Sequence, residues 1–142
     1  RENAGFAAAN NQGIVASRGR YVLLLNSDTV AQPGSIAALV AFADARPRAG
    51  VVGPRLENPD GSFQTGPTPF PSLWNELLSV TGIGRRLTYR GYPSRPAAAS
   101  RHAQSTDYVV GACMLARRAA IDAVGGLDER YFMYSEEPDW CW

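Results

Sequence analysis

The chain has 142 residues, of which 45% are hydrophobic and 19% are charged, as expected for one globular domain with one core. Its 14 basic and 13 acidic residues give a formal net charge of +1, which argues against a nucleic-acid partner. No apolar stretch is long enough to cross a bilayer. A single histidine, His102, argues against classical zinc sites and Ser-His-Asp triads. Two cysteines, Cys113 and Cys141, fit the core of a reduced, cytosolic chain.

The first part of the sequence alternates between predicted helices and predicted strands. Residues 3–19 are rich in alanine and predict a helix that ends at Gly19. Tyr21–Leu25 is an unbroken apolar run, typical of a strand buried on both faces of a parallel sheet. Residues 33–47 predict a helix capped by Ser35, and residues 50–56 predict a second short strand. This order of elements is typical of an α/β layer fold.

The remaining elements are shorter. Residues 58–66 predict a turn and a strand that pairs with the preceding one, and residues 71–82 predict an amphipathic helix with Trp74 in the core. Residues 83–104 have no hydrophobic period, and so long a loop is usually functional or disordered. Residues 106–118 predict another strand. Two helices complete the chain, over residues 117–126 and 135–142.

The loop over residues 83–104 is basic. Its arginines suit a diphosphate or a carboxylate group, although a solvated loop is the preferred explanation for most of them. They are Arg85, Arg86, Arg90, Arg95 and Arg101.

Three polar residues, Asn26, Ser27 and Asp28, directly follow the first predicted strand. Ligands of open α/β sheets bind beyond the carboxyl ends of the strands, so Asp28 would face such a crevice. Mg²⁺ and Mn²⁺ prefer oxygen ligands, and one carboxylate suffices if a substrate diphosphate supplies the rest. The alternative is that these residues only turn the chain or cap the next segment.

A second polar group, Glu136, Glu137 and Asp139, lies at the start of the last predicted helix, behind the aromatic segment "YFMYS". Acids in a first turn complement the helix dipole, which is the structural explanation. The functional explanation is a general base or a binding carboxylate whose pKa the aromatic residues raise.

Small residues and tryptophans give weaker indications. Gly111 and Ala112 interrupt the third long apolar run. They indicate either close packing or a place where a ligand approaches the backbone. Trp140 and Trp142 fit either the core or a surface that faces an acceptor.

Taken in order, "NAGFAAANNQGI", "YVLLLNSDTV" and "GACMLARRAAIDAVGGLDERYFMYSEEPDWCW" resemble the family 2 glycosyltransferases, and most closely their bacterial rhamnosyltransferase-like branch. The resemblance covers nearly the whole chain. It implies a GT-A-type (Rossmann-like) fold, with a mostly parallel sheet flanked by helices. It also implies transfer of a sugar from a nucleotide-sugar donor to a glycan or lipid-linked glycan acceptor, in polysaccharide synthesis at the inner face of the cytoplasmic membrane.

The resemblance also implies roles for single residues. Asp28 matches the last acid of the family's Asp-x-Asp motif, which binds Mg²⁺ or Mn²⁺ on the donor diphosphate, and Asn26 replaces its first acid. Glu137 takes the place of the catalytic base in the Glu-Asp-x-Asp motif. This is a departure, because the family has Asp there, and Glu136 remains a rival. Donor contacts are implied for Asn3, Gly5, Asn11, Asn26, Ser27, Gly111 and Ala112, and acceptor contacts for Asp139 and Trp140.

The family's mechanism is inverting, and its members begin with nucleotide-binding strands that have no counterpart in this sequence. We therefore expect residues 1–142 to be a truncated part of a single catalytic domain, without those strands and without the C-terminal helices, and weakly active or inactive alone. Full-length relatives of this kind would associate peripherally with the membrane. Two other functions stay open: a sugar-nucleotide nucleotidyltransferase, and a non-catalytic sugar-binding or interaction module.

Overall fold

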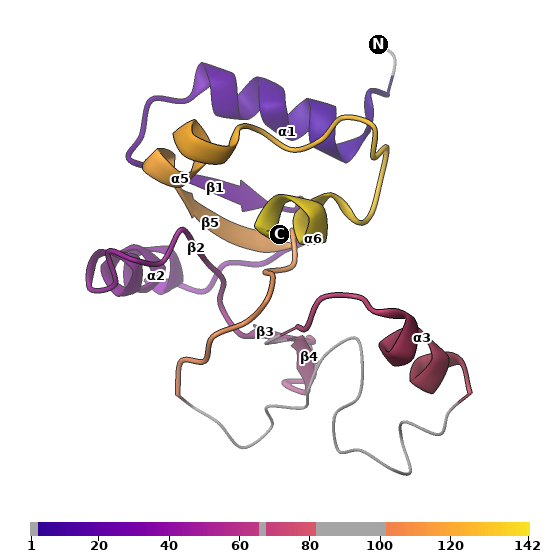
Figure 1. Cartoon of the computed structure of the whole chain (residues 1–142). Coiled ribbons are helices and arrows are strands. Elements are labelled where there is room, and N and C mark those ends of the chain that lie inside the picture. The colour runs from indigo at the N-terminus through magenta and orange to yellow at the C-terminus, as the bar shows by residue number, and fades with distance from the viewer. Residues whose placement is uncertain (1–2, 66–67, 82–101) are drawn as a thin grey trace.

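The computed structural model describes residues 3–65, 68–81 and 102–142. The arginine loop predicted over residues 83–104 lies almost entirely outside these residues. The elements are, in chain order, α1 (Gly5–Ala16), β1 (Tyr21–Leu25), α2 (Ser35–Asp44), β2 (Val51–Val52), β3 (Leu56–Glu57), β4 (Phe63–Thr65), α3 (Leu73–Val80), β5 (Cys113–Arg117), α5 (Arg118–Val124) and α6 (Glu136–Cys141). Figure 1 shows α1 and α2 on opposite sides of a small central sheet.

The central sheet has three strands in the order β1-β5-β2, and both pairings are antiparallel. In the register, Tyr21 lies opposite Arg117 and Leu25 opposite Cys113. The expected parallel pairing of neighbouring strands is therefore not found among the described strands. β1 and β2 do run in the same direction, but β5 inserts between them from far along the chain. An apolar run indicates burial on both faces, and it does not specify the direction of the neighbouring strand.

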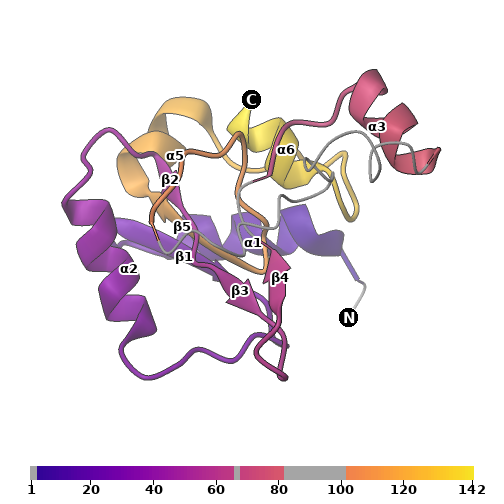
Figure 2. The ribbon, with the colours of Figure 1, turned by 90° about the horizontal axis from the view of Figure 1, so that it is seen from below.

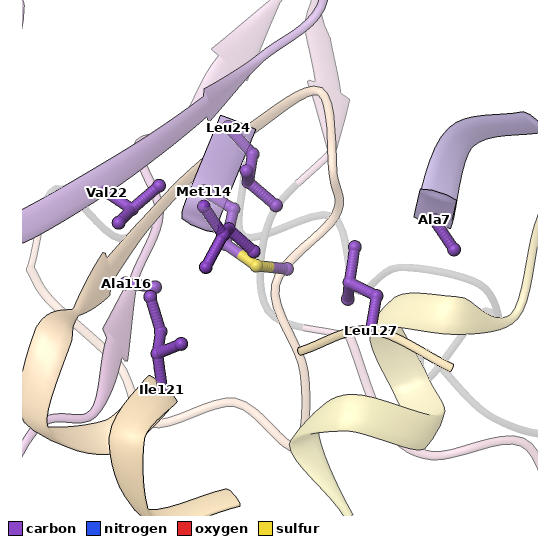
Figure 3. Close-up of a cluster of buried hydrophobic side chains, with 8 residues drawn as sticks. Ala7, Val22, Leu24, Met114, Ala116, Ile121 and Leu127 are labelled. Atoms are coloured by element: carbon purple, nitrogen blue, oxygen red, sulfur yellow. The ribbon is translucent and has the colours of Figure 1, made fainter. Parts of the chain in front are cut away.

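Alternate residues of the strands supply two separate cores, because successive side chains of a strand point to opposite faces. The larger core lies between the sheet and helices α1 and α5, and Figure 3 shows Met114 of β5 at its centre. Its buried members are Ala7, Ile14, Val22, Leu24, Met114, Ala116, Ile121 and Leu127. On the other face, Leu115 and Val52 pack against Ala43 of α2. Val22 and Leu24 of β1 are buried in the larger core, whereas Tyr21 and Leu23 are only partly buried on the other face, so the predicted burial of β1 on both faces is confirmed in part.

Two consecutive arginines at the end of β5 bind the C-terminal ends of two different helices. Arg117 donates to the carbonyl oxygens of Ala43 (2.8 Å) and Ala49 (3.2 Å), at the end of α2. Arg118 donates to the carbonyl oxygens of Ile14 (3.2 Å), Ser17 (3.1 Å) and Gly19 (3.2 Å), beyond the end of α1. The last carbonyls of a helix lack intrahelical partners, and a cation there is favourable.

Arg118→Ala is therefore expected to lower the free energy of unfolding by about 2 kcal/mol, because two part-buried carbonyls, of Ile14 and Ser17, lose a charged donor. Arg118→Lys should recover only part of this loss, since an ammonium lacks the fork of donors. The measurement is the urea midpoint of unfolding. Arg20→Ala is the control: it removes an exposed ion pair with Asp44 (2.7 Å), and such pairs contribute about 0–1 kcal/mol. Equal losses in Arg118→Ala and Arg20→Ala would contradict the proposed cap.

Several element ends differ from the predictions. α1 ends at Ala16 and Ser17 follows it as the cap, so Gly19 does not end the helix. Gly34, with φ of 81°, precedes α2, and Ser35 is the first helical residue instead of a side-chain cap. Gly111 and Ala112 precede β5 and do not lie within it. Local patterns locate an element better than its terminal residue.

The hairpin β3–β4 is confirmed, although its first strand starts at Leu56 and β2 belongs to the other sheet. Beyond it, Thr68 pairs with Tyr108, and α3 lies at the periphery of the molecule (Figure 2). Leu73, Trp74, Leu77 and Val80 of α3 are exposed, Trp74 at 65%, so the prediction of a core position for Trp74 is wrong. None of the described helices is long and apolar enough to span a membrane.

Candidate functional site

The polar residues after β1 form a tight turn. The carbonyl oxygen of Asn26 accepts a hydrogen bond from the Thr29 N–H (3.1 Å), which closes a four-residue turn with Asp28 at its third position. The side chain of Asp28 is exposed. The structural and the functional explanations of these residues are thus compatible, because the turn presents a carboxylate to solvent at the end of a buried strand.

This turn is held against the segment that leads into β5. The carbonyl oxygen of Ala112 accepts hydrogen bonds from the backbone N–H of Asn26 (3.1 Å) and from Oγ1 of Thr29 (3.1 Å). No pattern in the sequence indicates a role for Thr29, because threonine is common in turns. The position of Asp28 therefore depends on Ala112, more than eighty residues further along the chain.

Gly111, the residue before Ala112, binds the second polar group of the sequence through Glu137. The Gly111 N–H donates to Oε1 of Glu137 over 2.9 Å. A Cβ atom at Gly111 would lie 2.5 Å from this oxygen and 3.0 Å from Cζ of Phe6, so only glycine allows so close an approach. Two adjacent residues, Gly111 and Ala112, thus connect the turn that carries Asp28 with the carboxylate of Glu137.

Glu136 and Glu137 occupy different environments. Glu136 is buried, at 3% exposure, and its Oε2 has no hydrogen-bond partner among the described residues. Burial raises the pKa of Glu136, and the charge of Glu137 raises it further. Glu137 is only half-buried, so solvent and a substrate reach it more easily than they reach Glu136.

The turn before α6 has an unusual backbone. Tyr134 and Ser135 have φ angles of 70° and 74°, a left-handed conformation that is uncommon for residues with a side chain. Ser135 precedes α6 as predicted, but its side chain makes no capping hydrogen bond. Tyr131 donates from its hydroxyl to Oδ1 of Asp139 over 3.4 Å, which joins the two ends of this segment.

The three predicted donor residues near the N-terminus serve contacts within the chain. Oδ1 of Asn3 accepts the Gly5 N–H (3.0 Å) at the start of α1. Gly5 has φ of 84°, and a Cβ there would lie 2.5 Å from the carbonyl oxygen of Phe132. The amide of Asn11 exchanges two hydrogen bonds with the backbone of Leu127 (2.8 and 2.9 Å). These residues position the neighbouring loop, and the structure leaves a direct donor contact untested.

Trp140 and the two cysteines belong to the packing of the chain. The indole N–H of Trp140 donates to the carbonyl oxygen of Gly125 (2.8 Å), and its ring packs against the larger core. Burial raises the thiol pKa of both Cys113 and Cys141, which makes them poor nucleophiles. Cys113 is buried, as predicted, whereas Cys141 is only half-buried, and an acceptor role for Trp140 gains no support.

Among the described residues, no group of three or more His, Cys, Asp or Glu side chains could hold a metal ion. Asp28 is an exposed carboxylate and carries the chemistry that a hard cation prefers. A cation at Asp28 would therefore need further oxygen ligands from a substrate or from water.

Sequence comparison shows which known proteins this chain resembles. The family model described as glycosyl transferase family 2 matches residues 1–125. Among curated proteins, an N-acetylglucosaminyl-diphospho-decaprenol L-rhamnosyltransferase of Mycobacterium tuberculosis is 35% identical over 126 residues, covering 84% of this chain and 39% of that protein. The chain thus spans about two fifths of the length of this relative.

More distant relatives have related names. The low-salt glycan biosynthesis hexosyltransferase Agl10 of Haloferax volcanii is 26% identical over 145 residues, covering 99% of this chain and 43% of that protein. The O-antigen biosynthesis protein RfbC of Myxococcus xanthus is 29% identical over 130 residues, covering 89% of this chain and 10% of that protein. No solved structure matches the chain with significance.

Proposed function

Because the chain belongs to glycosyl transferase family 2, we propose that it carries the catalytic centre of an inverting, metal-dependent glycosyltransferase. The observation that carries this proposal is the pair of adjacent residues Gly111 and Ala112. Gly111 binds the carboxylate of Glu137, and Ala112 binds the turn that presents Asp28. One carboxylate for proton transfer and one for a cation are what transfer from a nucleoside diphosphate sugar requires.

In this proposal Glu137 is the general base. Its Oε1 is fixed by the Gly111 N–H, and a carboxylate has further lone pairs for an acceptor hydroxyl. Glu137 takes the hydroxyl proton while the acceptor oxygen forms a bond to the anomeric carbon. The bond from that carbon to the diphosphate oxygen breaks on the opposite face, and the nucleoside diphosphate leaves with the electron pair. The burial of Glu136 supports Glu137 over Glu136 for this role.

Asp28 is the proposed protein ligand of Mg²⁺ or Mn²⁺. The exposed carboxylate fits a hard cation whose other ligands come from the donor diphosphate and water. When bound, the cation stabilises the negative charge that develops on the diphosphate. The chain itself fixes the carboxylate through the turn and its two hydrogen bonds to Ala112.

For the donor, we propose contacts from Asn26, Ser27, Gly111 and Ala112. The first two precede Asp28 in its turn, Gly111 binds Glu137, and Ala112 binds the turn. Asn3, Gly5 and Asn11 would act on the donor through the loop that they position. Asp139, whose carboxylate lies near the Tyr131 hydroxyl, is a proposed acceptor contact. The GT-A arrangement with a mostly parallel sheet is likewise proposed for the whole catalytic domain, and the common direction of β1 and β2 is compatible with it.

The acceptor is proposed to be a glycan or a lipid-linked glycan, as the names of the related proteins suggest for those proteins. The whole protein would then work in the cytosol at the membrane face. The exposed apolar residues Leu73, Trp74 and Leu77 of α3 support peripheral association with lipid. Sedimentation with anionic vesicles tests this, and a protein that stays entirely in the supernatant would contradict it.

The proposal is tested by calorimetry on the native protein that contains this chain, with UDP-, dTDP- and GDP-sugars in the presence and absence of Mn²⁺. Binding that depends on Mn²⁺, followed by transfer with inversion at the anomeric carbon, supports a glycosyltransferase. Release of pyrophosphate from a nucleoside triphosphate would instead support a nucleotidyltransferase. Absence of any donor binding would leave a sugar-binding or interaction module.

Gly111→Ala is expected to displace the carboxylate of Glu137 and slow transfer while the protein remains folded. The new Cβ would meet Oε1 of Glu137 at 2.5 Å and push the carboxylate aside. A displacement of about 1 Å can lower a catalysed rate about 100-fold, which initial rates of transfer would measure. Gly13→Ala is the matched control, since a Cβ at Gly13 meets nothing within 4 Å, and it should leave the rate unchanged. Unchanged transfer in folded Gly111→Ala would contradict the assigned contact.

A further inference from the structure

The segment Phe132–Tyr134, which leads into α6, exposes three large side chains in succession. Phe132 is 56% exposed, Met133 is 52% exposed and Tyr134 is 77% exposed. The segment ends three residues before Glu137. Large apolar side chains exposed in succession, three residues before a candidate catalytic group, indicate a contact surface more than a packing defect.

The backbone of this segment is held in a conformation of high energy. Tyr134 and Ser135 are both left-handed, with φ of 70° and 74°, at about 1–2 kcal/mol per residue. Neither position is glycine, which would remove this strain. Strain of this kind persists where the surrounding structure imposes it, and it is concentrated at ligand sites.

One residue, Phe6, links the segment to the candidate base. The Phe6 N–H donates to the carbonyl oxygen of Phe132 (2.9 Å), and Cζ of Phe6 lies 3.0 Å from the place of a Cβ at Gly111. Gly111 in turn binds Glu137. Phe6 therefore contacts both the exposed segment and the residue that fixes the carboxylate of Glu137.

We propose that Phe132, Met133 and Tyr134 form a platform on which the pyranose ring of the acceptor lies, with its reactive hydroxyl toward Glu137. This inference rests on the proposed function for the role of Glu137. The face of an aromatic ring carries partial negative charge, and the C–H groups on one face of a pyranose carry partial positive charge. A thioether is polarisable and adapts to such a surface, and the tyrosine hydroxyl adds a polar contact.

The platform replaces Trp140 as the aromatic contact of the acceptor. Trp140 uses its N–H on Gly125 and its ring on the core, whereas the platform residues leave half or more of their surface to solvent. Acceptor recognition would then depend on the segment that also sets the direction in which α6 begins.

The test is saturation-transfer NMR on the native protein with a panel of methyl pyranosides as probes, together with acceptor kinetics. Tyr134→Asn removes the ring and keeps a residue that tolerates the left-handed backbone. It should weaken binding of the glycosides and raise the acceptor KM about tenfold, the equivalent of one stacking contact. Tyr134→Phe restores the ring without the hydroxyl and should recover most of both losses, and the donor KM should stay unchanged in both variants. Met133→Ser serves as a second variant outside the left-handed positions, with the same expectation.

Val15→Ala is the control, since Val15 is exposed on α1, at 86%, and has no part in the proposed site. Acceptor KM and glycoside binding that are unchanged in folded Tyr134→Asn and Met133→Ser would overturn the platform. If the wild-type protein binds no donor and transfers no sugar, the proposed function fails instead, while the glycoside experiment still decides whether the platform binds pyranoses.

Discussion

Replacement of Glu137 by Gln is expected to lower the rate of sugar transfer by about 10²- to 10⁴-fold, the usual contribution of a general base. The Gln side chain keeps the shape of Glu, and its amide oxygen can still accept the Gly111 N–H that Oε1 of Glu137 accepts over 2.9 Å. It cannot take the proton of an acceptor hydroxyl. Initial rates at saturating donor and acceptor measure the effect, and donor affinity should remain within about twofold of wild type, because the lost group acts on the acceptor.

The matched variant is Glu136→Gln. Glu136 is buried, and burial is the main reason that its pKa is raised, so its protonated form resembles Gln in charge and shape. Transfer by Glu136→Gln should therefore remain within about tenfold of wild type. A loss as large as that of Glu137→Gln, or full activity of Glu137→Gln, would move the base to Glu136.

Stability gives a second readout for Glu136. Its pKa is higher in the folded than in the unfolded protein, so the folded state keeps the proton to higher pH. The contribution of Glu136 to stability is then fully present below the ordinary Glu pKa and is lost as pH rises through the raised value. The difference between the urea midpoints of the wild type and of Glu136→Gln should therefore fall as pH rises through this range.

The elements of the fold were largely predictable because their signals are local. The apolar run of Tyr21–Leu25 predicted β1, and Gly125 follows α5 as expected, with φ of 91°. The pairing of β5 between β1 and β2 was not predictable, since strand direction depends on contacts between distant segments. Trp74 shows the same limit, because an amphipathic pattern defines an apolar face and does not say what covers it.

The candidate site was predictable from the sequence only in part. Positions after a strand and at the start of a helix make Asp28 and Glu137 candidates, and only the resemblance to the family assigns them roles. The link between them through Gly111 and Ala112 needed the structure, since small residues also fit plain packing. Asn11 is the opposite case: its amide binds Leu127, 116 residues away, and no local pattern distinguishes such a bond from a ligand contact. The left-handed backbone at Tyr134 has no signal in the sequence either, because neither it nor Ser135 is glycine.

Asp28→Asn is expected to abolish the effect of Mn²⁺ on donor binding. In the wild-type protein, Mn²⁺ should tighten the binding of the preferred nucleoside diphosphate by about 10- to 100-fold, because a contact to a charged group contributes about 1.5–3 kcal/mol. Asn keeps the size of the side chain and the turn closed by Asn26 and Thr29, but it lacks the negative charge that a hard cation prefers. Calorimetric titration of UDP, dTDP and GDP, with and without Mn²⁺, measures the difference.

Binding without metal provides the internal control for this experiment. The affinity of Asp28→Asn in the absence of Mn²⁺ should equal that of the wild type or exceed it slightly, since a negative charge near the diphosphate is removed.

Asp122→Asn, at an exposed position on α5, removes the same charge far along the chain from the turn and should leave the effect of Mn²⁺ intact. Equal tightening by Mn²⁺ in wild type and Asp28→Asn would place the cation elsewhere. No tightening in the wild type would mean that donor binding does not depend on metal, and the charge of the diphosphate would then have to be balanced by cationic side chains.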